Sequence, residues 1–402
     1  MQVRIIQSLF LIAFATLTAE AQVNSQTLAL TPPMGWNDYN HYNMDISDAK
    51  IRSAADWMVS SGMRDAGYAY VNIDDGWEGE RGVDGIPHPN NRFPDMKALA
   101  DYVHAKGLRL GIYSSPGPET CGGMVGSYGH EAQDARMFAQ RGIDYLKYDL
   151  CSYIPILKAY SKGDPAKSRE REMEVHLKME NALRATGRPI VYSLCQYGRD
   201  MSWAWGPAVG ANMWRTTADI KDNYDRMSVL GFSQAGLSRY VSPGHWNDPD
   251  MLEVGNGGMN RDEYQTHMSL WSLIAAPLTA GNDLTTMNDE TKSILLNREV
   301  IAIDQDVLGR AGERVYADGP IEVWTRPLAN GDMAVGIFNR GDYQSPVELD
   351  MARIGIQHPV LARDLWAHKS LGRVSTPFNS VVPKHGAVLL RLSQRDDDRI
   401  SE

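Results

Sequence analysis

Two sites in this sequence, an aspartate doublet and a single aspartate near a lysine, contain acidic residues suited to catalysis. Asp74 and Asp75 form a doublet at the end of the apolar run Ala69–Asp75. Lys147 precedes Asp149 by two residues, so both side chains lie on one face of an expected strand, Asp144–Asp149. A cation beside Asp149 would keep the carboxylate ionised, as a carboxylate nucleophile requires. A buried structural ion pair is the alternative explanation of this spacing.

Other expected strands also end in polar and aromatic residues. A single aspartate at a strand end is more often a helix cap or turn residue than a catalytic group. Here the pattern recurs at six strand ends, and carboxylates next to aromatic rings suit a ligand with many hydroxyl groups. The further residues of this kind are Trp77, Tyr113, Gln196, Tyr197, Trp214, Arg215, Asp219, Trp246, Asp248 and Asp250.

The elements that must position these residues alternate between strands and helices from about residue 30 to 305. Expected strands are Ala69–Asp75, Leu108–Ser115, Asp144–Asp149 and Pro189–Cys195, and expected helices are Ser47–Ala66, Asp95–Ala105, Glu131–Gln140 and Pro165–Ala185. Repeated strand–helix units over this length predict an α/β fold, a (β/α)8 TIM barrel whose strand ends share one mouth. An open doubly wound sheet is the alternative, but no glycine-rich phosphate loop follows an early strand.

After about Val315 the pattern changes to short alternating strands. These are Ile321–Pro327, Met333–Arg340, Pro346–Met351 and Ala387–Leu392, with Asn330-Gly331 as a turn between the first two. They predict a C-terminal antiparallel β-sandwich. We therefore divide the chain into a signal peptide (1–21), a catalytic barrel (22–310), a sandwich (311–395) and a frayed tail (396–402).

The N-terminal segment has the features of an export signal. Arg4 precedes an apolar run from Leu9 to about Leu17, and Ala19-Glu20-Ala21 fits an A-x-A cleavage site. The run is shorter than the roughly 20 residues that a membrane-spanning helix needs. We expect cleavage after Ala21 and a secreted or periplasmic protein, with a membrane anchor as the alternative.

Composition excludes several classes of partner. The net charge is −10 and no basic stripe is present, which argues against nucleic acid or an anionic membrane as a partner. The three cysteines, Cys121, Cys151 and Cys195, allow one disulfide and one free thiol. We expect no cofactor, and we expect no metal because His130, Glu131 and Asp134 lack the second histidine of an HExxH motif.

Several long motifs together resemble one family. They are TPPMGWNDYN, IDDGW, FPDMKALADYVHAKGLRLGIYSSPG, GSYGHEAQDA, DYLKYDLC, WRTTADI, HWNDPDMLEVGNGGM and ARDLWAH. In this order they are similar to family 27 glycoside hydrolases, which include α-galactosidases and α-N-acetylgalactosaminidases. The resemblance runs from about Leu28 to Leu392, nearly the whole mature chain.

The resemblance implies a role for each matching residue. Asp149 would be the nucleophile and Asp219, four residues after Arg215, the general acid/base of a retaining mechanism. Asp74 and Asp75 would accept hydrogen bonds from the 4- and 6-hydroxyls of galactose, and Lys147 would lie close to the substrate. Trp36, Tyr113, Arg215 and Asp250 would line the pocket, and Cys121 and Cys151 would form a disulfide. We also expect a raised pKa for Asp219 and a pKa of Asp149 depressed by Lys147.

Three departures from the family pattern bear on specificity. Gly76 stands where the doublet is usually followed by Cys, and Tyr39 stands where many relatives carry Trp. Gln196 replaces a Glu that helps hold the 2-hydroxyl in many α-galactosidases. Because Gln196 and Tyr197 are bulky, we expect them to exclude an N-acetyl group and to favour galactose.

The sequence thus predicts an exo-acting α-galactosidase that acts on a galactose-containing oligosaccharide, polysaccharide or glycoconjugate. The first alternative keeps the chemistry and changes the sugar to an N-acetylgalactosaminide, a β-L-arabinopyranoside or an isomaltose-type glucan. A carbohydrate-binding protein without catalysis and a metalloenzyme are the alternatives from other classes. The presence of Asp149, Asp219 and Lys147 argues against the former, and the incomplete metal motif argues against the latter.

Overall fold

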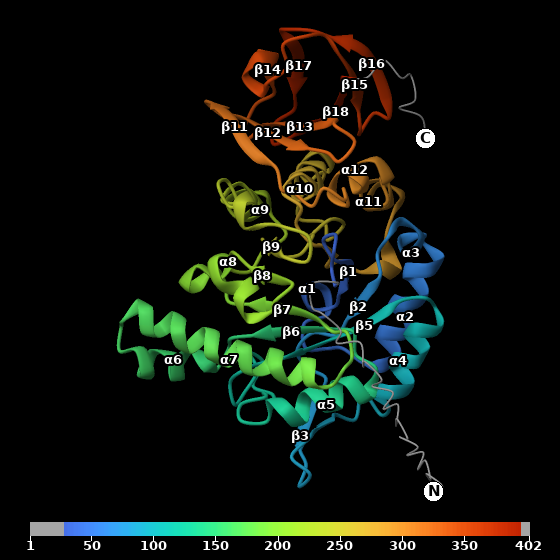
Figure 1. The fold of residues 1–402 in the computed structure, drawn as a ribbon. Coiled ribbons are helices and arrows are strands. Elements are labelled where there is room, and N and C mark those ends of the chain that lie inside the picture. Colours follow the sequence, from blue (N-terminus) through green and yellow to red (C-terminus); the bar gives the residue numbers. More distant parts are fainter. Residues whose placement is uncertain (1–27, 395–402) are drawn as a thin grey trace, which may run out of the picture.

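The computed structural model describes residues 28–394, so the predicted signal peptide and frayed tail lie outside the described residues. Within this range no helix has both the length and the apolar character needed to cross a membrane. The chain forms a barrel of parallel strands followed by an antiparallel sandwich (Figure 1).

Eight parallel strands form the barrel sheet in the order β10-β1-β2-β5-β6-β7-β8-β9. Their bounds are β1 Met34–Asn37, β2 Tyr70–Asn72, β5 Arg109–Ser114, β6 Tyr145–Asp149, β7 Val191–Cys195, β8 Met213–Arg215, β9 Trp246–Asp248 and β10 Leu278–Ala280. The ring closes just after β9, where Leu252 forms a parallel bridge to Ala280 of β10. There the Leu252 amide donates to Thr279 O at 2.7 Å, and the Gly281 amide donates to Leu252 O at 2.9 Å. The predicted (β/α)8 barrel is therefore confirmed.

Helices connect the strands of the barrel. Their bounds are α1 Tyr39–Tyr42, α2 Asp48–Ser60, α3 Met63–Ala66, α4 Met96–Ala105, α5 Glu131–Arg141, α6 Tyr153–Ser161, α7 Pro165–Ala185, α8 Ser202–Trp205, α9 Tyr224–Phe232, α10 Arg261–Leu273, α11 Asp289–Leu295 and α12 Arg298–Asp304. Short 3-10 turns include η2, Arg199–Met201, and η3, Gly206–Val209. An antiparallel hairpin that was not predicted, β3 Glu78–Arg81 and β4 Pro87–Pro89, follows β2.

Two predicted helices begin one residue later than expected because their first residues are caps. The Ser47 side chain accepts from the Lys50 amide, and the Asp95 side chain accepts from the Ala98 amide. Each cap satisfies a backbone donor that has no partner in the first helical turn. The predicted helix Ser47–Ala66 is also divided, because Gly62 has a φ of 88° between α2 and α3.

The C-terminal unit contains a six-stranded antiparallel sheet, β11-β12-β13-β18-β15-β16, and a two-stranded one, β14-β17. The strands are β11 Glu313–Asp318, β12 Ile321–Pro327, β13 Met333–Asn339, β14 Ser345–Leu349, β15 Val360–Asp364, β16 Lys369–Val374, β17 Phe378–Val382 and β18 Ala387–Ser393. The predicted Asn330-Gly331 turn connects β12 to β13, with Gly331 at a φ of 88°. The predicted sandwich is confirmed.

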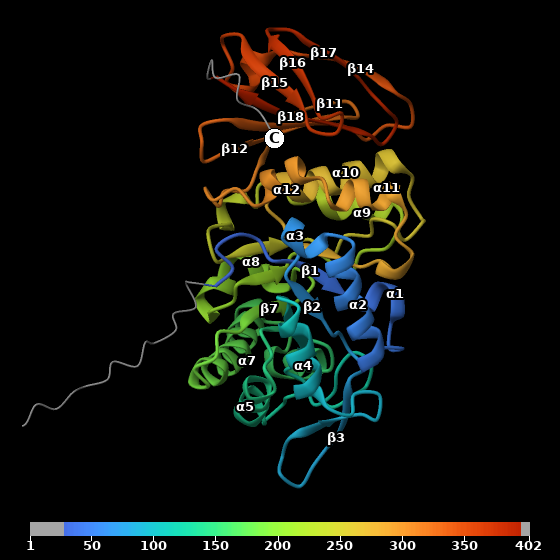
Figure 2. The same ribbon diagram turned by 90° about the vertical axis from the view of Figure 1, so that its right-hand side faces the viewer.

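The sandwich lies over the helices at one side of the barrel. In Figure 2 the helices α9 to α12 form a layer between the C-terminal sheets and the barrel strands. Helix α10 packs against β12, β13 and β18. Apolar residues of this sheet, including Trp324, Phe338 and Leu389, belong to the same buried cluster as the helices of the barrel.

Candidate active site

A pocket of about 550 Å³ opens where the carboxyl ends of the barrel strands meet. Eight of the residues predicted to catalyse or to bind substrate line it: Asp74, Asp75, Tyr113, Lys147, Asp149, Arg215, Asp219 and Asp250. Asp149 and Arg215 are the last residues of β6 and β8. Strand β2 ends at Asn72, so Asp74 and Asp75 lie where strand gives way to loop and both reach the pocket.

The Asp149 carboxylate is buried and held by two phenols. Tyr113 donates to Oδ2 at 3.0 Å, and Tyr197 donates to Oδ1. Burial raises the pKa of Asp149, although Lys147 and the Tyr197 hydrogen bond oppose this effect. Lys147 favours the ionised form of Asp149 as expected, but its Nζ donates to Asp74 Oδ2 at 2.8 Å.

Asp219 projects into the open mouth, with 73% of its side chain exposed. Arg215 Nη2 lies 2.9 Å from Asp219 Oδ1 and 2.9 Å from Asp250 Oδ2. Burial acts to raise the pKa of Asp219, but the Arg215 guanidinium outweighs it and the pKa lies below the usual value. The expected order of the two pKa values is therefore wrong for the free protein, because burial raises the pKa of Asp149 more than Lys147 lowers it, and Arg215 pairs with Asp219.

The doublet carboxylates are oriented by different donors. Besides Lys147, Asp74 Oδ2 accepts from Asn37 Nδ2 at 2.7 Å. Asp75 accepts from the Thr120 hydroxyl at 2.8 Å and from the Gly122 amide at 2.6 Å. Each carboxylate keeps acceptor capacity on its pocket side, because a carboxylate offers about four lone-pair sites.

Asp250 is held in a strained position beside Arg215. Its φ is 91°, in the left-handed region that non-glycine residues rarely occupy. Its Oδ2 accepts from the Ile220 amide at 2.7 Å, and its Oδ1 accepts from the Met251 amide at 2.9 Å. Such strain persists only where surrounding contacts enforce it and is commonest at functional sites.

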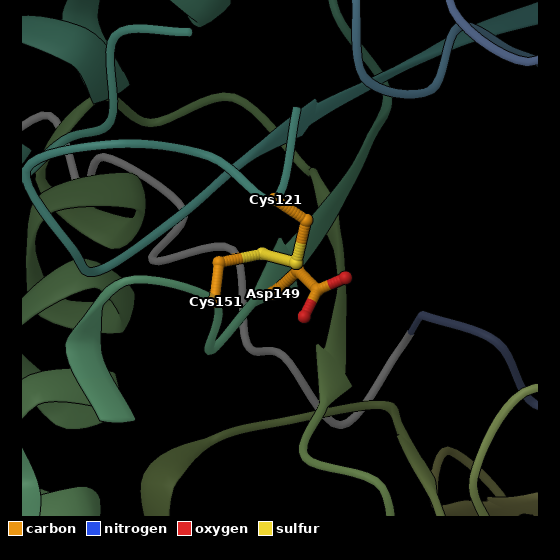
Figure 3. A group of neighbouring side chains, drawn as sticks. All are labelled: Cys121, Asp149 and Cys151. Atoms are coloured by element: carbon orange, nitrogen blue, oxygen red, sulfur yellow. A yellow bond between two sulfur atoms is a disulfide. The ribbon is translucent and has the colours of Figure 1, made fainter. Parts of the chain in front are cut away.

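A disulfide joins Cys121 to Cys151 next to the Asp149 carboxylate (Figure 3). The predicted pairing is confirmed, and Cys195 is the free, buried thiol. The bridge connects the loop after β5, which carries Thr120 and Gly122, to Cys151, two residues after the end of β6. The loop that holds Asp75 is thereby tied to the strand that carries Asp149.

Two of the predicted substrate-binding residues lie behind the pocket wall. Trp36 is fully buried and donates from Nε1 to Asn282 O at 2.8 Å. Gln196 is fully buried and its amide contacts His176 Nε2 at 2.7 Å. Neither side chain lines the pocket as expected, because each is held by a buried partner away from it, Trp36 by Asn282 and Gln196 by His176 of α7. The tryptophans at strand ends, Trp77, Trp214 and Trp246, are likewise buried in the core.

Comparison with known proteins decides the family. Residues 31–306 match the family model described as alpha galactosidase A, and residues 318–392 match the alpha galactosidase C-terminal beta sandwich domain. An alpha-galactosidase of Cyamopsis tetragonoloba is 44% identical over 92% of this chain and 87% of its own length. The chain belongs to the α-galactosidase family.

Solved structures of other family members share this architecture. Alpha-galactosidase I of Mortierella vinacea superposes with a TM-score of 0.84 at 36% identity, over 91% of this chain and 98% of its own. The alpha-galactosidase of Saccharomyces cerevisiae, solved with raffinose, has a TM-score of 0.82 at 29% identity, over 92% and 99% of the two chains. The family relationship therefore extends over both the barrel and the sandwich.

The pocket of this family member contains residues that sequence reasoning did not select. They include Asn40, His41, Lys221, Asp222, Met251, Glu253 and Asn256. They come from the segments after β1, β8 and β9, and their position soon after a barrel strand is the signal that identifies such residues. Glu253 accepts from Asn256 at 2.7 Å and from Asn40, and burial raises its pKa to about 7.

Potential metal ligands near the pocket have other partners. Cys121, Asp149 and Cys151 place three ligand atoms within 4.8 Å of one another, but the two sulfurs are bonded to each other and offer no thiolate. Asp134 pairs with Arg81 at 2.6 Å, and Glu131 pairs with Lys178 at 2.6 Å. Glu131 and Asp134 therefore serve as ion-pair partners in the first turn of α5.

Proposed function

We propose that this family member is a retaining exo-α-galactosidase that releases terminal α-D-galactosyl residues. The observation that carries the proposal is the pairing of carboxyl groups in one pocket: Asp149, buried and held by two phenols, and Asp219, exposed at the mouth. A buried, oriented carboxylate suits attack on a bound sugar, and an exposed carboxyl suits proton exchange with a leaving group and with water.

In the first step an Asp149 oxygen attacks C1 of the galactosyl unit as the bond to the leaving oxygen breaks. Asp219 gives its proton to that oxygen, so the aglycone leaves as an alcohol. In the second step Asp219 takes a proton from water, whose oxygen attacks C1 and releases Asp149 as a carboxylate. We expect the two carboxyl groups to be about 5–5.5 Å apart, the separation of retaining enzymes.

Substrate binding must alter the protonation of this pair. In the free protein Arg215 favours an ionised Asp219, and burial favours a proton on Asp149. To reach the glycosidic oxygen Asp219 must leave Arg215, and both the loss of this ion pair and the cover provided by the sugar raise its pKa. The proton then rests on Asp219, as the first chemical step requires.

The doublet accounts for the choice of galactose. The free acceptor sites of Asp74 and Asp75 suit the axial 4-hydroxyl and the 6-hydroxyl. Glucose carries an equatorial 4-hydroxyl and would leave a buried carboxylate without its donor, at a loss of about 1–3 kcal/mol. Because Gln196 lies behind Tyr197, we expect Tyr197 rather than Gln196 to face the sugar on that side of the pocket.

Export is part of the same proposal. The Cys121–Cys151 disulfide beside the nucleophile suits an oxidising compartment, and the predicted signal peptide would deliver the chain there. Oligosaccharides, polysaccharides or glycoconjugates with terminal galactose are the substrates that this location and this pocket favour.

Azide rescue tests the roles of the two carboxyls. In Asp219→Gly azide should attack the galactosyl-enzyme and give α-galactosyl azide from a nitrophenyl α-galactoside. In Asp149→Gly azide should attack the substrate directly and give the β-azide. Without azide each variant should lose at least about 10²–10⁴-fold in kcat on substrates that need acid assistance. Products of the opposite configurations would exchange the two roles.

Matched nitrophenyl glycosides test the sugar. The wild-type protein should hydrolyse the α-galactoside faster than the α-N-acetylgalactosaminide, the β-L-arabinopyranoside and the α-glucoside. Faster turnover of any of these would assign the pocket to that sugar. Galactose binding without turnover of any glycoside would instead indicate a carbohydrate-binding protein.

A further inference from the structure

Tyr197 donates directly to the carboxylate of Asp149. We propose that it is a positioning residue for Asp149, one of two phenols that together fix the orientation and the ionisation of the nucleophile. Tyr113 donates to Oδ2 and Tyr197 donates to Oδ1, so each carboxylate oxygen has its own donor. The inference deepens the proposed function and rests on it.

The backbone conformation around Tyr197 and the contacts of its neighbours fix the direction of this side chain. Tyr197 has a φ of 57°, a left-handed conformation that non-glycine residues rarely adopt. The preceding Gln196 is anchored in the interior by His176 at 2.7 Å. His176 Nδ1 lies 2.7 Å from Glu172 O and must donate to that carbonyl, so His176 Nε2 accepts from the Gln196 amide.

The residue after Tyr197 fixes the loop against β8. The Gly198 amide donates to Arg215 O at 3.2 Å. A Cβ at this position would lie 2.3 Å from Thr216 O, and Gly198 itself has a φ of 76°. Anchors on both sides therefore hold Tyr197 in its strained conformation, with its ring in the pocket wall.

Both phenols that hold Asp149 also contact the same disulfide. Tyr113 Oη lies 3.1 Å from Cys151 Sγ, and Tyr197 Oη lies 3.5 Å from Cys121 Sγ. In Figure 3 the bridge lies beside the Asp149 carboxylate. The disulfide thus lies against the hydroxyl groups of both tyrosines. Residues from β5, from the end of β6 and from the loop after β7 therefore meet at the Asp149 carboxylate.

Tyr197 stays an O–H donor wherever Asp149 is ionised. Burial raises its pKa, and the neighbouring Cys195 and Asp149 raise it further. Hydrogen bonds to an ionised acceptor are roughly twice as strong as those between neutral groups. When one oxygen of Asp149 bonds C1, the other becomes the ester carbonyl oxygen and keeps its phenol, and neither tyrosine transfers a proton.

Other charged and titratable groups also face Asp149 from every strand around it. They are Asp74 and Asp75 after β2, Tyr113 on β5, Lys147 on β6, Cys195 on β7 and Arg215 on β8. Lys147 and Arg215 favour the ionised form, and the two aspartates oppose it. Removal of one hydroxyl at residue 197 leaves all of these groups in place, so its effect can be measured separately.

The test is the Tyr197→Phe variant, which removes the hydroxyl and keeps the ring. Isotope-edited infrared titration of the Asp149 carboxyl, identified by its absence in Asp149→Asn, should show the pKa raised by about one unit. The kcat on a nitrophenyl α-galactoside should fall about 10–100-fold while KM changes less than about threefold. Tyr113→Phe should change both quantities in the same direction, and Tyr343→Phe, which removes an exposed hydroxyl in the sandwich, should change neither.

An unchanged Asp149 pKa together with a raised KM would mean that Tyr197 only lines the pocket and does not position Asp149. This result would overturn the inference. If Tyr197→Phe folds poorly, Tyr197→Leu also removes the hydroxyl, offers no side-chain donor and must show the same pKa shift. The infrared titration requires no substrate. A wild-type protein inactive on α-galactosides would therefore refute the proposed function, and the titration would still decide the role of Tyr197.

Discussion

The two aspartates of the doublet differ in the kind of group that holds them. Asp74 accepts from the cationic Lys147, whereas Asp75 accepts from two neutral donors, Thr120 and Gly122. Burial raises the pKa of Asp75, and those two donors oppose it. A sugar hydroxyl that donates to Asp75 needs the carboxylate form, so galactose affinity should fall as pH falls through this raised pKa.

Thr120→Val tests the contribution of the hydroxyl donor. The valine keeps the shape of the side chain but removes one hydrogen bond to the charged form of Asp75, so the pKa of Asp75 rises further. We expect galactose to inhibit about 3–10-fold more weakly, and the loss of inhibition on acidification to begin at higher pH than in the wild type. Inhibition constants measured from about pH 4 to about pH 7 check both effects.

Thr376→Val is the matched control for this substitution. The Thr376 hydroxyl donates to Asp350 at 3.0 Å in the sandwich, away from the pocket, so its loss should leave galactose inhibition unchanged at every pH. If Thr120→Val gave the wild-type pH dependence, the loop hydroxyl would have no part in keeping Asp75 ionised.

For single residues, the sequence shows which side chains lie near the pocket. It does not show which hydrogen-bond or ion-pair partner each of them has. Lys147 lies two residues before Asp149, and this spacing correctly indicates a shared strand face. It does not show that Lys147 Nζ reaches past β5 to Asp74, which follows β2, or that Arg215 pairs with Asp219. The order of the pKa values depends on these contacts, and they exist only once the barrel has closed.

Helix α7 supports the loop that carries Tyr197. Glu172 is fully buried in this helix, and burial together with Asp200 of η2 raises its pKa to about 9. Ser168 of the same helix donates to Asp200 at 2.7 Å. The contact between α7 and η2 therefore contains a carboxyl that the folded protein keeps protonated at neutral pH.

The Glu172→Gln variant should be more stable than the wild type in alkaline solution. The unfolded chain releases this proton near pH 4.5, whereas the folded chain holds it to about pH 9. The folded state therefore binds more protons within this window, and wild-type stability falls with rising pH by up to about 1.4 kcal/mol per unit. The amide cannot ionise, so its advantage should be near zero at about pH 5 and on the order of 3 kcal/mol at about pH 8.

Thermal unfolding at both pH values measures this difference. Glu170→Gln, an exposed substitution on the same helix, should stay within about 0.5 kcal/mol of the wild type at each pH. A variant advantage that does not grow with pH would mean that Glu172 is ionised in the folded protein.

Strands that bury most of their residues have a recognisable apolar pattern and were predictable from the sequence. Strands that expose most of their residues were not. Strands β12, β13 and β18 bury most of their residues and were predicted to within a residue or so of their ends. Strands β11 and β16 expose most of theirs, so no alternation marks them in the sequence. The hairpin β3–β4 is missed for a related reason, because its short strands hold Arg81 and proline rather than an apolar pattern.

The six-stranded sheet of the sandwich is buried on both faces. On β13, Val335 and Ile337 belong to the interior of the sandwich, whereas Ala334 and Phe338 belong to the cluster shared with the barrel helices. Between them Gly336 allows a close approach, because a Cβ there would lie 2.4 Å from Leu273 of α10. Alternation in the sequence reveals two faces, but only packing shows that the second face covers α10.

Polar contacts reinforce this boundary between the barrel and the sandwich. Arg326 of β12 is fully buried and donates to Ser272 O at 2.6 Å and to Asp304 O at 3.0 Å. Trp366 donates from Nε1 to Ser269 Oγ at 2.9 Å. Separation of the two units would break these hydrogen bonds and expose the apolar side chains of the shared cluster to water, so it is costly. We therefore expect the barrel and the sandwich to unfold together.

Phe338→Ala tests this cooperativity. The ring packs edge-on against Phe232 of α9, with centroids 5.4 Å apart, and is fully buried. Its removal should lower the free energy of unfolding by about 3–5 kcal/mol and shift one calorimetric transition, without splitting it. Galactose binds at the barrel and should raise the temperature of this same transition in both proteins.

Val381→Ala is the control, because Val381 lies on β17 with 59% of its surface exposed and should change stability within about 0.5 kcal/mol. Two transitions in the wild type, with galactose moving one and Phe338→Ala moving the other, would show that the units fold independently. A single shared transition means that the sandwich stabilises α10, which leads directly into the β10 strand that closes the barrel. Damage at Phe338 would then weaken galactose binding on heating even though this ring lies outside the pocket.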